Sequence, residues 1–480
     1  MALPNHKTKI VCTIGPASDT EEVMEQMIRA GMNIARLNFS HGDFASHQAV
    51  IHRLRAAARK AGRRIAILAD MPGPKIRIGQ FAQEPIQLKS GELFMITTDL
   101  VPGDQNQVST TFEPLPKAVK TGDTIYLNDG FIQLQVVKIQ GPEVHCQVLV
   151  GGELRSRKGL NLPGIDLGIS AFTAHDRKVL QFAAQNGVDA VSQSFVQSSA
   201  DIEAVRRVAR ELKYEPLIIA KIERSRALDH IDEIVATADG IMIARGDLGV
   251  EIPIEQIAVV QKSIMHKANL LGKPVITATQ MLESMTNNRR PTRAESTDVA
   301  NAILDGTDAV MLSGESAMGL FPVDAVTMLA KIAEAVEPHR PASYMRAALN
   351  DLAGADEPNL AELIARSVES VFERISPVAV FVPTHGGYTA RRIARFRLPV
   401  WIAAVSSRQE TCQKLQFSYG VFPVLEPEHP ENWNAYVERW LRSQAVTGDL
   451  VILTEGPSSK HPERNNRMEI IDLRVGPRRK

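Results

Sequence analysis

Eight short segments rich in β-branched residues, each followed by an amphipathic stretch, restrict the possible folds of this chain more than any other feature. Repeated β/α units build parallel sheets or barrels, and eight of them predict a closed (β/α)8 barrel of the TIM type. Helical periodicity is clear at 198–213, 253–271 and 322–337. The predicted strands are 9–15, 33–40, 64–70, 189–195, 216–223, 240–247, 273–280 and 308–314.

About a hundred residues separate the third predicted strand from the fourth, and they show the period-2 alternation of strands. Within them, Asp129-Gly130 and Gly151-Gly152 are dipeptides that favour hairpin turns. This insert follows Asp70, at the end of a barrel strand where the active sites of such barrels lie. We therefore expect residues 71–167 to form an inserted β-barrel lid domain on a barrel made of 1–70 and 168–344.

A second α/β pattern begins at about residue 345. It predicts a helix at 358–375 and strands at 377–382, 399–405 and 449–454, with helices between the strands. We interpret residues 345–480 as a C-terminal doubly wound α/β domain.

Charge and cysteine content exclude several classes of function. Lys plus Arg and Asp plus Glu both number 55, so no global field attracts the protein to nucleic acid or to an anionic membrane. The three cysteines are far apart, which indicates neither a disulfide framework nor a structural zinc site. The N-terminus lacks the apolar region of a signal peptide, and no apolar run approaches the ~18 residues of a membrane span. We expect a cytoplasmic protein.

The C-terminal ends of the barrel strands should meet at one mouth. Lys221 and Glu223 are two residues apart on one strand, so both side chains point the same way. Glu223 and Asp247 offer carboxylates from neighbouring strands, a set of ligands for a hard divalent cation such as Mg²⁺. The predicted strand ends carry Arg36, Asn38, Ser40, His41, Asp70, Ser194, Lys221, Glu223, Arg245, Asp247, Thr279, Gln280, Ser313 and Glu315.

Two carboxylates, a divalent cation, a lysine and an arginine at one mouth suit a phosphorylated substrate. Phosphoryl transfer is catalysed mainly by positioning and charge neutralisation, so this set fits it better than hydrolysis or aldol chemistry. For any single member of the set, a salt bridge that closes the barrel is the alternative interpretation.

Seven segments carry a specific resemblance to the pyruvate kinase family, in order and across the whole chain. That family has the architecture predicted above: a barrel, a β lid after the third strand and a C-terminal α/β domain. The segments are KIVCTIGPAS, MNIARLNFSHG, IIAKIER, GIMIARGDLGVEIP, ITATQMLESM, PTRAESTDVANA and MLSGESA.

The resemblance implies transfer of the phosphoryl group of phosphoenolpyruvate to ADP, giving pyruvate and ATP in the last step of glycolysis. Lys221 would neutralise the transferring group, Arg36 would grip the phosphate, and Glu223 with Asp247 would hold Mg²⁺, for which Mn²⁺ can substitute. Backbone N–H groups around Gly246 would bind the substrate carboxylate.

Further roles follow from the same resemblance. Thr279 lies like the family's threonine near the carbon that is protonated; whether it or an ordered water donates the proton stays open. His175 stands where some members have a lysine, and a neutral imidazole would weaken that nucleotide contact. The nucleotide-binding positions would be Pro16, Asn38, His41, Arg77 and His175.

The monovalent-cation position departs from many family members. The resemblance places K⁺ at Asn38, Ser40, Asp70 and the carbonyl of Met71, but the next loop has Lys75 where K⁺-requiring members have a glutamate. The Lys75 ammonium would supply the cation's charge, so we expect activity that does not require K⁺. A solvated hinge lysine is the alternative interpretation.

The C-terminal segment PTHGGYTARR resembles the family's effector loop, which binds phosphorylated small molecules, although an ordinary strand-to-helix turn fits the spacing equally well. The loop at 458–466 does not resemble that of the bisphosphate-binding members, so the identity of the effector stays open. A homotetramer is implied by resemblance alone. The effector-binding positions would be Thr384, His385, Gly386, Gly387, Tyr388 and Thr389.

Two other functions are the alternatives to this interpretation. Barrel lyases that bind phosphoenolpyruvate or pyruvate also use paired acidic residues and Mg²⁺, but they need neither a β lid nor Lys221 directed at a phosphoryl group. A catalytically silent sensor would use only the C-terminal loop, and it would not need Lys221, Glu223, Asp247 and Thr279 together.

Overall fold

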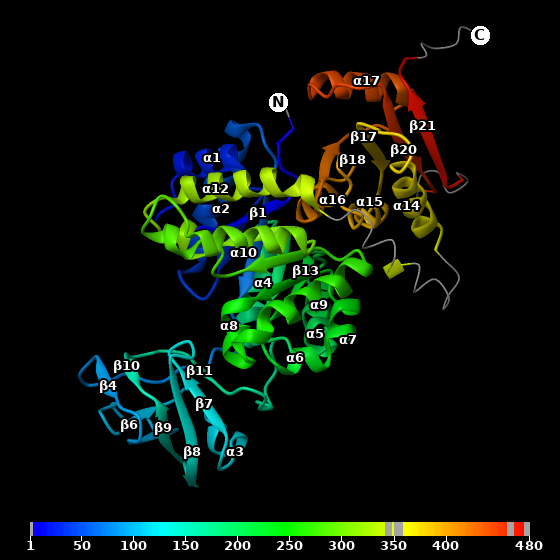
Figure 1. Ribbon diagram of the computed structural model, residues 1–480. Coiled ribbons are helices and arrows are strands. Elements are labelled where there is room, and N and C mark those ends of the chain that lie inside the picture. Colours follow the sequence, from blue (N-terminus) through cyan, green and yellow to red (C-terminus); the bar gives the residue numbers. More distant parts are fainter. Residues whose placement is uncertain (1–2, 341–347, 350–358, 458–464, 475–480) are drawn as a thin grey trace.

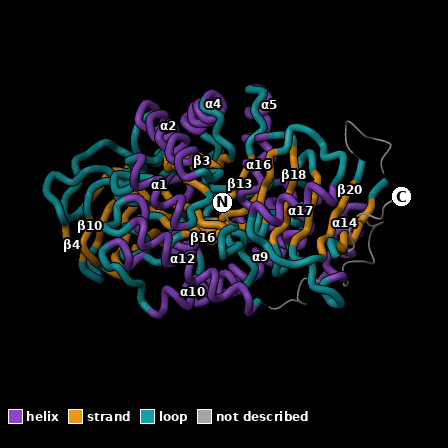
Figure 2. The backbone as a smooth tube through the Cα atoms, turned by 90° about the horizontal axis from the view of Figure 1, so that it is seen from above, coloured by secondary structure: helices purple, strands orange, loops and turns teal. Residues whose placement is uncertain are grey.

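The structure is a computed structural model that describes residues 3–340, 348–349, 359–457 and 465–474. Three parts follow one another in space, with a β-rich insert at one end, a β/α barrel in the middle and a C-terminal α/β part at the other end (Figure 1). Figure 2 shows from above that the strands of the insert and of the C-terminal sheet lie on opposite sides of the barrel.

The predicted eight-stranded barrel is confirmed. Its strands are all parallel, and they close in the order β1-β16-β15-β14-β13-β12-β3-β2. Apolar side chains fill its interior, and Phe417 of the C-terminal part packs with them at the N-terminal end of the strands. The strands are β1 (Lys9–Thr13), β2 (Ile34–Asn38), β3 (Ala66–Met71), β12 (Ala190–Gln193), β13 (Leu217–Ile222), β14 (Gly240–Ala244), β15 (Val275–Ala278) and β16 (Ala309–Leu312).

The helices around the barrel begin and end at residues suited to those positions. In α2, Asp43 forms a capping box with Ser46, and Gly62 ends the helix in the left-handed conformation. The helices are α1 (Glu21–Ala30), α2 (Phe44–Ala61), α4 (Ala174–Gln185), α5 (Ser199–Glu211), α6 (Arg226–Asp229), α7 (Ile231–Thr237), α8 (Arg245–Glu251), α9 (Ile257–Leu270), α10 (Arg293–Leu304), α11 (Gly314–Ala317) and α12 (Pro322–Val336).

The insert is built of strands, as predicted, around its own apolar core. Its strands form a six-stranded sheet, β11-β7-β8-β9-β5-β6, and a two-stranded sheet, β10-β4. The elements are β4 (Ile86–Leu88), β5 (Leu93–Thr97), β6 (Gln107–Ser109), α3 (Leu115–Ala118), β7 (Thr124–Leu127), β8 (Ile132–Gln140), β9 (Glu143–Val150), β10 (Gly152–Leu154) and β11 (Leu160–Asn161).

One of the two predicted hairpin turns is wrong. Asp129-Gly130 does connect the antiparallel pair β7 and β8. Gly151-Gly152 instead marks the point where the chain leaves one sheet for the other, since β9 pairs with β5 and β8 while β10 pairs with β4. A Cβ on Gly151 would lie 2.2 Å from the carbonyl oxygen of Leu88, so glycine is needed here for close backbone approach.

The C-terminal part is the predicted α/β sheet with two additional strands. The order is β19-β18-β17-β20-β21, parallel except for β21, which runs antiparallel to β20 at the edge. Its elements are α14 (Leu360–Val371), β17 (Ala379–Pro383), α15 (Tyr388–Ala394), β18 (Trp401–Ser406), α16 (Gln409–Lys414), β19 (Val421–Leu425), α17 (Trp433–Ser443), β20 (Leu450–Glu455) and β21 (Arg467–Asp472). Most of the loop 458–466 lies outside the described residues.

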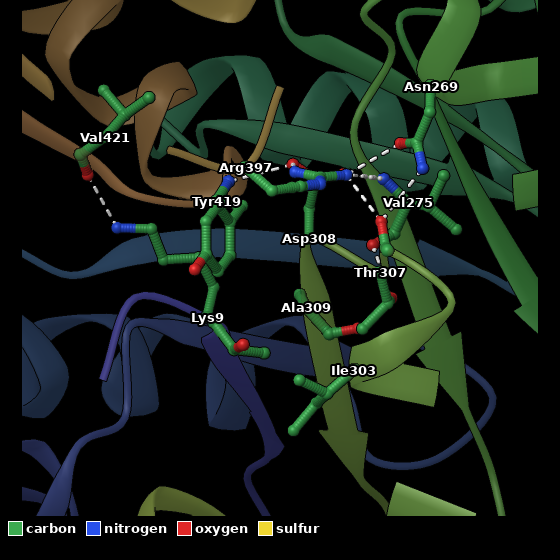
Figure 3. A network of polar contacts seen from close by, with 12 residues as sticks. Lys9, Asn269, Val275, Ile303, Thr307, Asp308, Ala309, Arg397, Tyr419 and Val421 are labelled. Carbon is green, nitrogen blue, oxygen red and sulfur yellow. Dashed lines mark hydrogen bonds and ion pairs between the residues drawn. The ribbon is translucent and has the colours of Figure 1, made fainter. Parts of the chain in front are cut away.

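A buried polar network joins the barrel to the C-terminal part (Figure 3). Asp308, just before β16, accepts hydrogen bonds from Arg397 Nη1 at 2.6 Å and from the Tyr419 backbone N–H at 2.9 Å. Arg397 also donates to Asn269 Oδ1 at 2.7 Å, and Lys9 Nζ of β1 donates to the Val421 carbonyl oxygen at 2.7 Å. The C-terminal part is therefore fixed to the end of the barrel opposite the mouth.

Within the described residues, no helix combines the length and the apolar character that crossing a membrane requires.

Candidate active site

A cavity of about 210 Å³ lies at the C-terminal ends of the barrel strands, between the barrel and the insert. Charged and polar side chains predicted for the mouth are brought together in its wall. The lining includes Arg36, Asn38, Ser40, Asp70, Lys75, Arg77, Asp129, Asn161, Ser194, Phe195, Lys221, Glu223 and Asp247.

Asp70, at the end of β3, is the centre of the hydrogen-bond network in this cavity. Its Oδ2 accepts from Arg36 Nε at 2.9 Å, and its Oδ1 accepts from Ser192 Oγ at 2.6 Å. Arg36 Nη1 donates in turn to Thr13 Oγ1 at 2.8 Å. Burial alone would raise the pKa of Asp70, but Lys221, Arg36 and the Ser192 hydrogen bond outweigh burial and hold this pKa at about 2. The carboxylate therefore stays charged and fixes Arg36.

Lys221 of β13 and Glu223, one residue past the end of that strand, point into the same cavity, as their spacing predicts. Lys221 Nζ lies 3.2 Å from Glu223 Oε2 and 3.5 Å from Asp70 Oδ1, and it donates to Ser194 Oγ at 2.6 Å. Burial disfavours the ammonium, yet the two carboxylates raise the pKa of Lys221 to about 12. A permanent positive charge is thus held at the floor of the cavity.

The carboxylates of Glu223 and Asp247 suit a hard cation. Glu223 is buried and accepts the Phe195 backbone N–H at 2.7 Å on Oε1. Burial, together with the nearby charge of Asp247 and against that of Lys221, raises the pKa of Glu223. Asp247 has no hydrogen bond or ion pair with any described residue, and its side chain is exposed at the cavity. A divalent cation would relieve the repulsion between these two carboxylates.

A metal site made wholly of protein side chains is not indicated. Among the described residues, no group of three or more His, Cys, Asp or Glu side chains could hold a metal ion. Two carboxylates leave the remaining positions to water and substrate oxygens, the usual arrangement for Mg²⁺ in phosphoryl-transfer sites.

Thr279 is connected to the cavity through its neighbours but does not line it. Its Oγ1 accepts the Gly246 backbone N–H at 2.8 Å and donates to the Ala278 carbonyl oxygen at 2.7 Å. Thr279 and Gln280 both have positive φ, 65° and 53°. That conformation is a strained one for a β-branched residue, and such strain often occurs at functional sites.

Arg245 does not line the mouth, contrary to the prediction from the strand ends. Strand β14 stops at Ala244, and α8 begins at Arg245, so the alternation of the strand no longer applies. Its buried guanidinium donates to the Thr279 carbonyl oxygen at 2.7 Å and pairs with Asp298 at 2.7 Å. Arg245 therefore supports the Thr279 backbone.

Lys75 lies in the wall of the same cavity as Asn38, Ser40 and Asp70. Its side chain has no ion pair or hydrogen bond with any other described residue, while its backbone N–H donates to the Gly73 carbonyl oxygen at 3.0 Å. Burial, and then the charges of Lys221 and Arg77, lower the pKa of Lys75, while Asp70 and Glu223 act in the opposite direction. Met71 is buried at the end of β3, in register with Gln193.

The positions expected to contact a nucleotide are only partly brought together. Asn38 and Arg77 line the cavity, whereas Pro16, His41 and His175 do not. His41 is exposed, but partial desolvation of its ring, followed by the charges of Lys75, Arg77 and Arg36, lowers its pKa. The His175 ring lies 6.2 Å from that of Phe44, and it makes no hydrogen bond with any described residue.

Three residues in or behind the cavity wall were not predicted from the sequence. Asp129 comes from the hairpin tip of the insert, and its partner in the turn, Gly130, lies close to Val250 of α8. Ser192 and Thr13 act behind the cavity wall on Asp70 and Arg36. The Asp129-Gly130 dipeptide was a signal for a turn but carried no information about where that turn would lie.

The predicted effector loop is a compact turn before α15. Thr384 Oγ1 accepts the Gly387 backbone N–H at 2.9 Å, and Gly387 has a φ of 80°. The His385 ring contacts Arg408 Nη1 at 3.2 Å, and the backbone carbonyl oxygen of His385 accepts from Thr411 Oγ1 at 2.6 Å. Gly386 and Tyr388 face a cavity shared with the barrel, and Thr389 lies in the first turn of α15.

Comparisons with known proteins agree with this geometry. Residues 5–326 match the family described as "Pyruvate kinase, barrel domain", and residues 362–471 match "Pyruvate kinase, alpha/beta domain". A pyruvate kinase of Thermococcus litoralis is 45% identical over 476 residues, covering 98% of this chain and 100% of the relative. One of Staphylococcus aureus strain MRSA252 is 41% identical over 470 residues, covering 97% and 80%.

A solved structure gives the same result for the fold. The crystal structure of a pyruvate kinase from Cryptosporidium parvum has a TM-score of 0.91 to this structure and 36% sequence identity, and the match covers 98% of this chain and 96% of that one. These matches support the kinase and give no support to the lyase alternative.

Proposed function

This chain belongs to the pyruvate kinase family, and from that premise we propose that the cavity between barrel and insert is its catalytic site. The protein transfers the phosphoryl group of phosphoenolpyruvate to ADP and forms pyruvate and ATP. The observation that carries the assignment of the site is the contact of Lys221 with both Asp70 and Glu223 inside that cavity.

Lys221 and Arg36 are the groups that bind and neutralise the phosphoryl group. Asp70 holds both cations in place, and the surrounding walls limit the access of water, so their charges act in a medium of low dielectric constant. Binding energy is then available where negative charge shifts from the attacking phosphate oxygen of ADP, which bonds to the transferred group, to the enol oxygen, whose bond to phosphorus breaks.

Glu223 and Asp247 would hold Mg²⁺, with Mn²⁺ as a substitute, and the cation would supply positive charge that neutralises the phosphorylated substrate. The Asp247 backbone N–H orients the substrate carboxylate, and the Gly246 N–H joins it only when its 2.8 Å hydrogen bond to Thr279 Oγ1 is released. When the phosphoryl group has left, the enolate carbon takes a proton at the Thr279 side, from the Thr279 hydroxyl or from a water that it orders.

The Lys75 ammonium takes the place of the monovalent cation beside Asn38, Ser40, Asp70 and the Met71 carbonyl. Its lack of an ion-pair partner within the described residues supports this assignment, because an unpaired ammonium is available to the carboxylates of Asp70 and Glu223 that act on it. On the nucleotide side, Arg77 and Asn38 line the cavity, and Pro16, His41 and His175 complete the binding surface only if the insert moves toward the barrel.

We also propose a regulated homotetramer that works in the cytoplasm. Its effector is a phosphorylated small molecule bound at the turn of residues 384–389. All three cysteines are buried free thiols, which suits a reducing compartment.

The decisive experiment is ADP-dependent formation of pyruvate from phosphoenolpyruvate, compared between the wild type and Lys221→Met. We expect kcat to fall about 1,000-fold or more, equivalent to about 4 kcal/mol of transition-state stabilisation. Lys178→Met, at an exposed lysine of α4, is the matched control and should retain full activity. Retained turnover in Lys221→Met with a preserved fold would exclude this catalytic site.

A further inference from the structure

The connection by which the chain returns from the insert to the barrel is held by residues that follow β13. This connection runs from the end of β11 to the start of α4. Arg224 Nη2 donates to the carbonyl oxygens of Leu162 at 3.1 Å and of Ile165 at 3.2 Å. Ser225 Oγ accepts the Gly164 backbone N–H at 3.1 Å. Three backbone groups near the beginning of the connection are therefore bound to the loop after β13.

A buried ion pair fixes Arg224 itself. Its Nη1 lies 3.0 Å from Glu251 Oε1, and the two side chains are only 3% and 0% exposed. The second oxygen of Glu251, Oε2, accepts the backbone N–H of Ser225 at 3.3 Å and the Ser225 hydroxyl at 3.2 Å. Since solvent screens a pair buried to this degree only weakly, losing either partner leaves an uncompensated charge in the interior. The ion pair therefore holds the guanidinium in one place.

This ion pair joins the two segments that carry the carboxylates of the catalytic cavity. Arg224 directly follows Glu223, and Glu251 is the last residue of α8, four positions after Asp247. Residues four apart lie on the same side of a helix, so the side of α8 that carries Asp247 is also the side fixed at Glu251. One buried contact thus links the return connection with both carboxylate segments.

The anchored carbonyl of Leu162 is next to the part of the insert that faces the cavity, where Figure 1 shows β11 on the side toward the barrel. Asn161 of β11 lines the cavity, and β11 pairs with β7, which leads into the turn with Asp129. Arg77, another lining residue of the insert, forms a backbone bridge with Gly159, just before β11. Fixing Leu162 therefore fixes the end of the insert that carries Arg77 and Asp129.

The rest of the connection has the features of a hinge. Gly164 and Gly168 have φ of 70° and 63°, and a Cβ on either would meet no atom of the described residues within 4 Å, apart from its chain neighbours. Glycine adopts positive φ at little cost, so this stretch can change its backbone angles. Beyond it the chain is fixed again, because Gln193 Nε2 donates to the Ala171 carbonyl oxygen at 2.7 Å. Of the two fixed points, the one held by Arg224 is nearer to the insert.

We propose that Arg224 is a positioning residue for phosphoryl transfer. Through Leu162 and Ile165 it holds the insert, and with it Arg77 and Asp129, in place over the carboxylates of the cavity. This inference rests on the proposed function of that cavity as the catalytic site. Arg224 does not itself line the cavity, so it acts only through the groups that it holds.

The two substrates should respond differently to a displaced insert. Lys221 and Arg36 belong to the barrel strands β13 and β2, so the binding of phosphoenolpyruvate should depend little on where the insert lies. Arg77, on the nucleotide side, moves with the insert. Loss of the anchor at Arg224 should therefore raise KM for ADP and lower kcat, with little change in KM for phosphoenolpyruvate.

A double variant separates positioning from folding. Arg224→Met alone leaves Glu251 buried without a partner and can prevent folding, so the main test combines Arg224→Met with Glu251→Met. Replacing a buried ion pair by apolar side chains is often neutral or stabilising, and here it also removes both bonds to the connection. We expect a melting temperature within about 5 °C of the wild type, a KM for ADP raised about tenfold and a kcat lowered about 10- to 100-fold.

The conservative variant Arg224→Lys keeps a positive charge beside Glu251 but cannot reproduce the two-carbonyl contact of the guanidinium. It should recover part of the affinity for ADP that the double variant loses. Arg177→Met is the matched control, because Arg177 lies on α4, which the same connection leads into, and its ion pair with Glu211 is exposed. Its KM values should equal those of the wild type.

Hydrogen exchange gives a readout that does not depend on turnover. In the double variant, the backbone amides of residues 159–168 should exchange faster, because their connection is no longer anchored. The amides of β16 and of the C-terminal sheet should exchange as in the wild type, and Arg177→Met should change neither region.

Unchanged KM for ADP in the double variant would overturn the proposal. A fall in kcat with both KM values and the exchange of residues 159–168 unchanged would also overturn it, because only the amount of folded enzyme would then differ. Failure of the proposed function has a different signature: the wild type forms no pyruvate, or Lys221→Met stays active. Wild-type activity that requires Lys221, together with a normal KM for ADP in the double variant, rejects only the role of Arg224.

Discussion

The guanidinium of Arg245 donates to the carbonyl oxygen of Thr279 at 2.7 Å and thereby holds a threonine whose φ is 65°. The same side chain donates to the preceding carbonyl, that of Ala278, at 3.3 Å. A residue with a positive φ of this kind stores roughly 1–3 kcal/mol of strain. We interpret Arg245 as a positioning residue that keeps the Thr279 hydroxyl next to Gly246.

Replacing Arg245 by Met should release this strain and displace the Thr279 hydroxyl. We expect kcat to fall about 10- to 100-fold, with a smaller change in KM for phosphoenolpyruvate, because the proton-delivery side is affected more than phosphate binding. Steady-state kinetics measures the changes in kcat and KM separately. Asp298→Asn removes the ion pair but leaves both carbonyl bonds, and it should be milder; equal losses in the two variants would contradict the positioning role.

Lys75 should make turnover independent of K⁺. The wild type is expected to keep its activity in a buffer whose only monovalent cation is tetramethylammonium. Lys75→Glu should lose about 100-fold in that buffer and recover when K⁺ is added, because the acidic cavity then needs a cation from solution. Lys89→Glu, at an exposed position of the insert outside the cavity, is the control. K⁺-dependent wild-type turnover would show that Lys75 is only a solvated hinge residue.

Lys9 should make stability rise with pH in the alkaline range. Its side chain is buried, and burial, only partly opposed by Glu337 and Asp308, lowers its pKa from 10.5 to about 7. Between these two values the unfolded chain holds a proton that the native protein does not. The free energy of unfolding therefore increases with pH in this window, by at most about 1.4 kcal/mol per pH unit.

The comparison that isolates this effect is with Lys9→Met, in which the titrating group is absent. The wild type should gain stability relative to Lys9→Met as the pH is raised from about 7 toward 10, measured by denaturant midpoints. Lys178→Met, at an exposed lysine, should show no such trend. Parallel pH profiles for the wild type and Lys9→Met would contradict the prediction.

Arg397 should be a large contributor to the junction between barrel and C-terminal part. Arg397→Met leaves the carboxylate of Asp308 buried without its cationic partner, which typically costs about 3–5 kcal/mol. Hydrogen exchange should increase around Tyr419, whose backbone N–H bonds to Asp308. Adding Asp308→Asn removes the unpaired charge and should recover part of the lost stability. If the double variant is no more stable than Arg397→Met, the buried charge is not the cause of the loss.

Periodicity was enough to predict the barrel, because each strand is short, apolar and followed by a helix. It also predicted that Lys221 and Glu223 lie together, and their side chains are 3.2 Å apart although β13 ends at Ile222, because the chain does not turn into a helix directly after this strand. It failed for Arg245, because the alternation ends with β14 at Ala244 and the chain turns into a helix. The local pattern of apolar and polar residues does not show at which residue a strand ends and a helix begins.

Contacts between segments that are distant in the chain could not be predicted from the sequence either. Ser192 reaches Asp70 because the register pairs these two residues across β12 and β3, and register depends on how the whole barrel closes. The approach of Gly151 to the Leu88 backbone depends on the packing of two small sheets, so the dipeptide alone suggested an ordinary hairpin. The edge strand β21 has a single buried side chain and so lacks a clear apolar pattern.

The insertion point of the β-rich domain also affects the order of folding. Strands β3 and β12 are neighbours in the barrel, yet residues paired across them, such as Asp70 and Ser192, are 122 positions apart in the chain. Closing an unfolded loop of that length costs entropy before any contact is gained, and slow folding follows from such non-local pairing. The insert has its own core. If the insert folds first, it brings its two ends together and shortens the effective loop. Strands β3 and β12 then pair across a domain that is already compact.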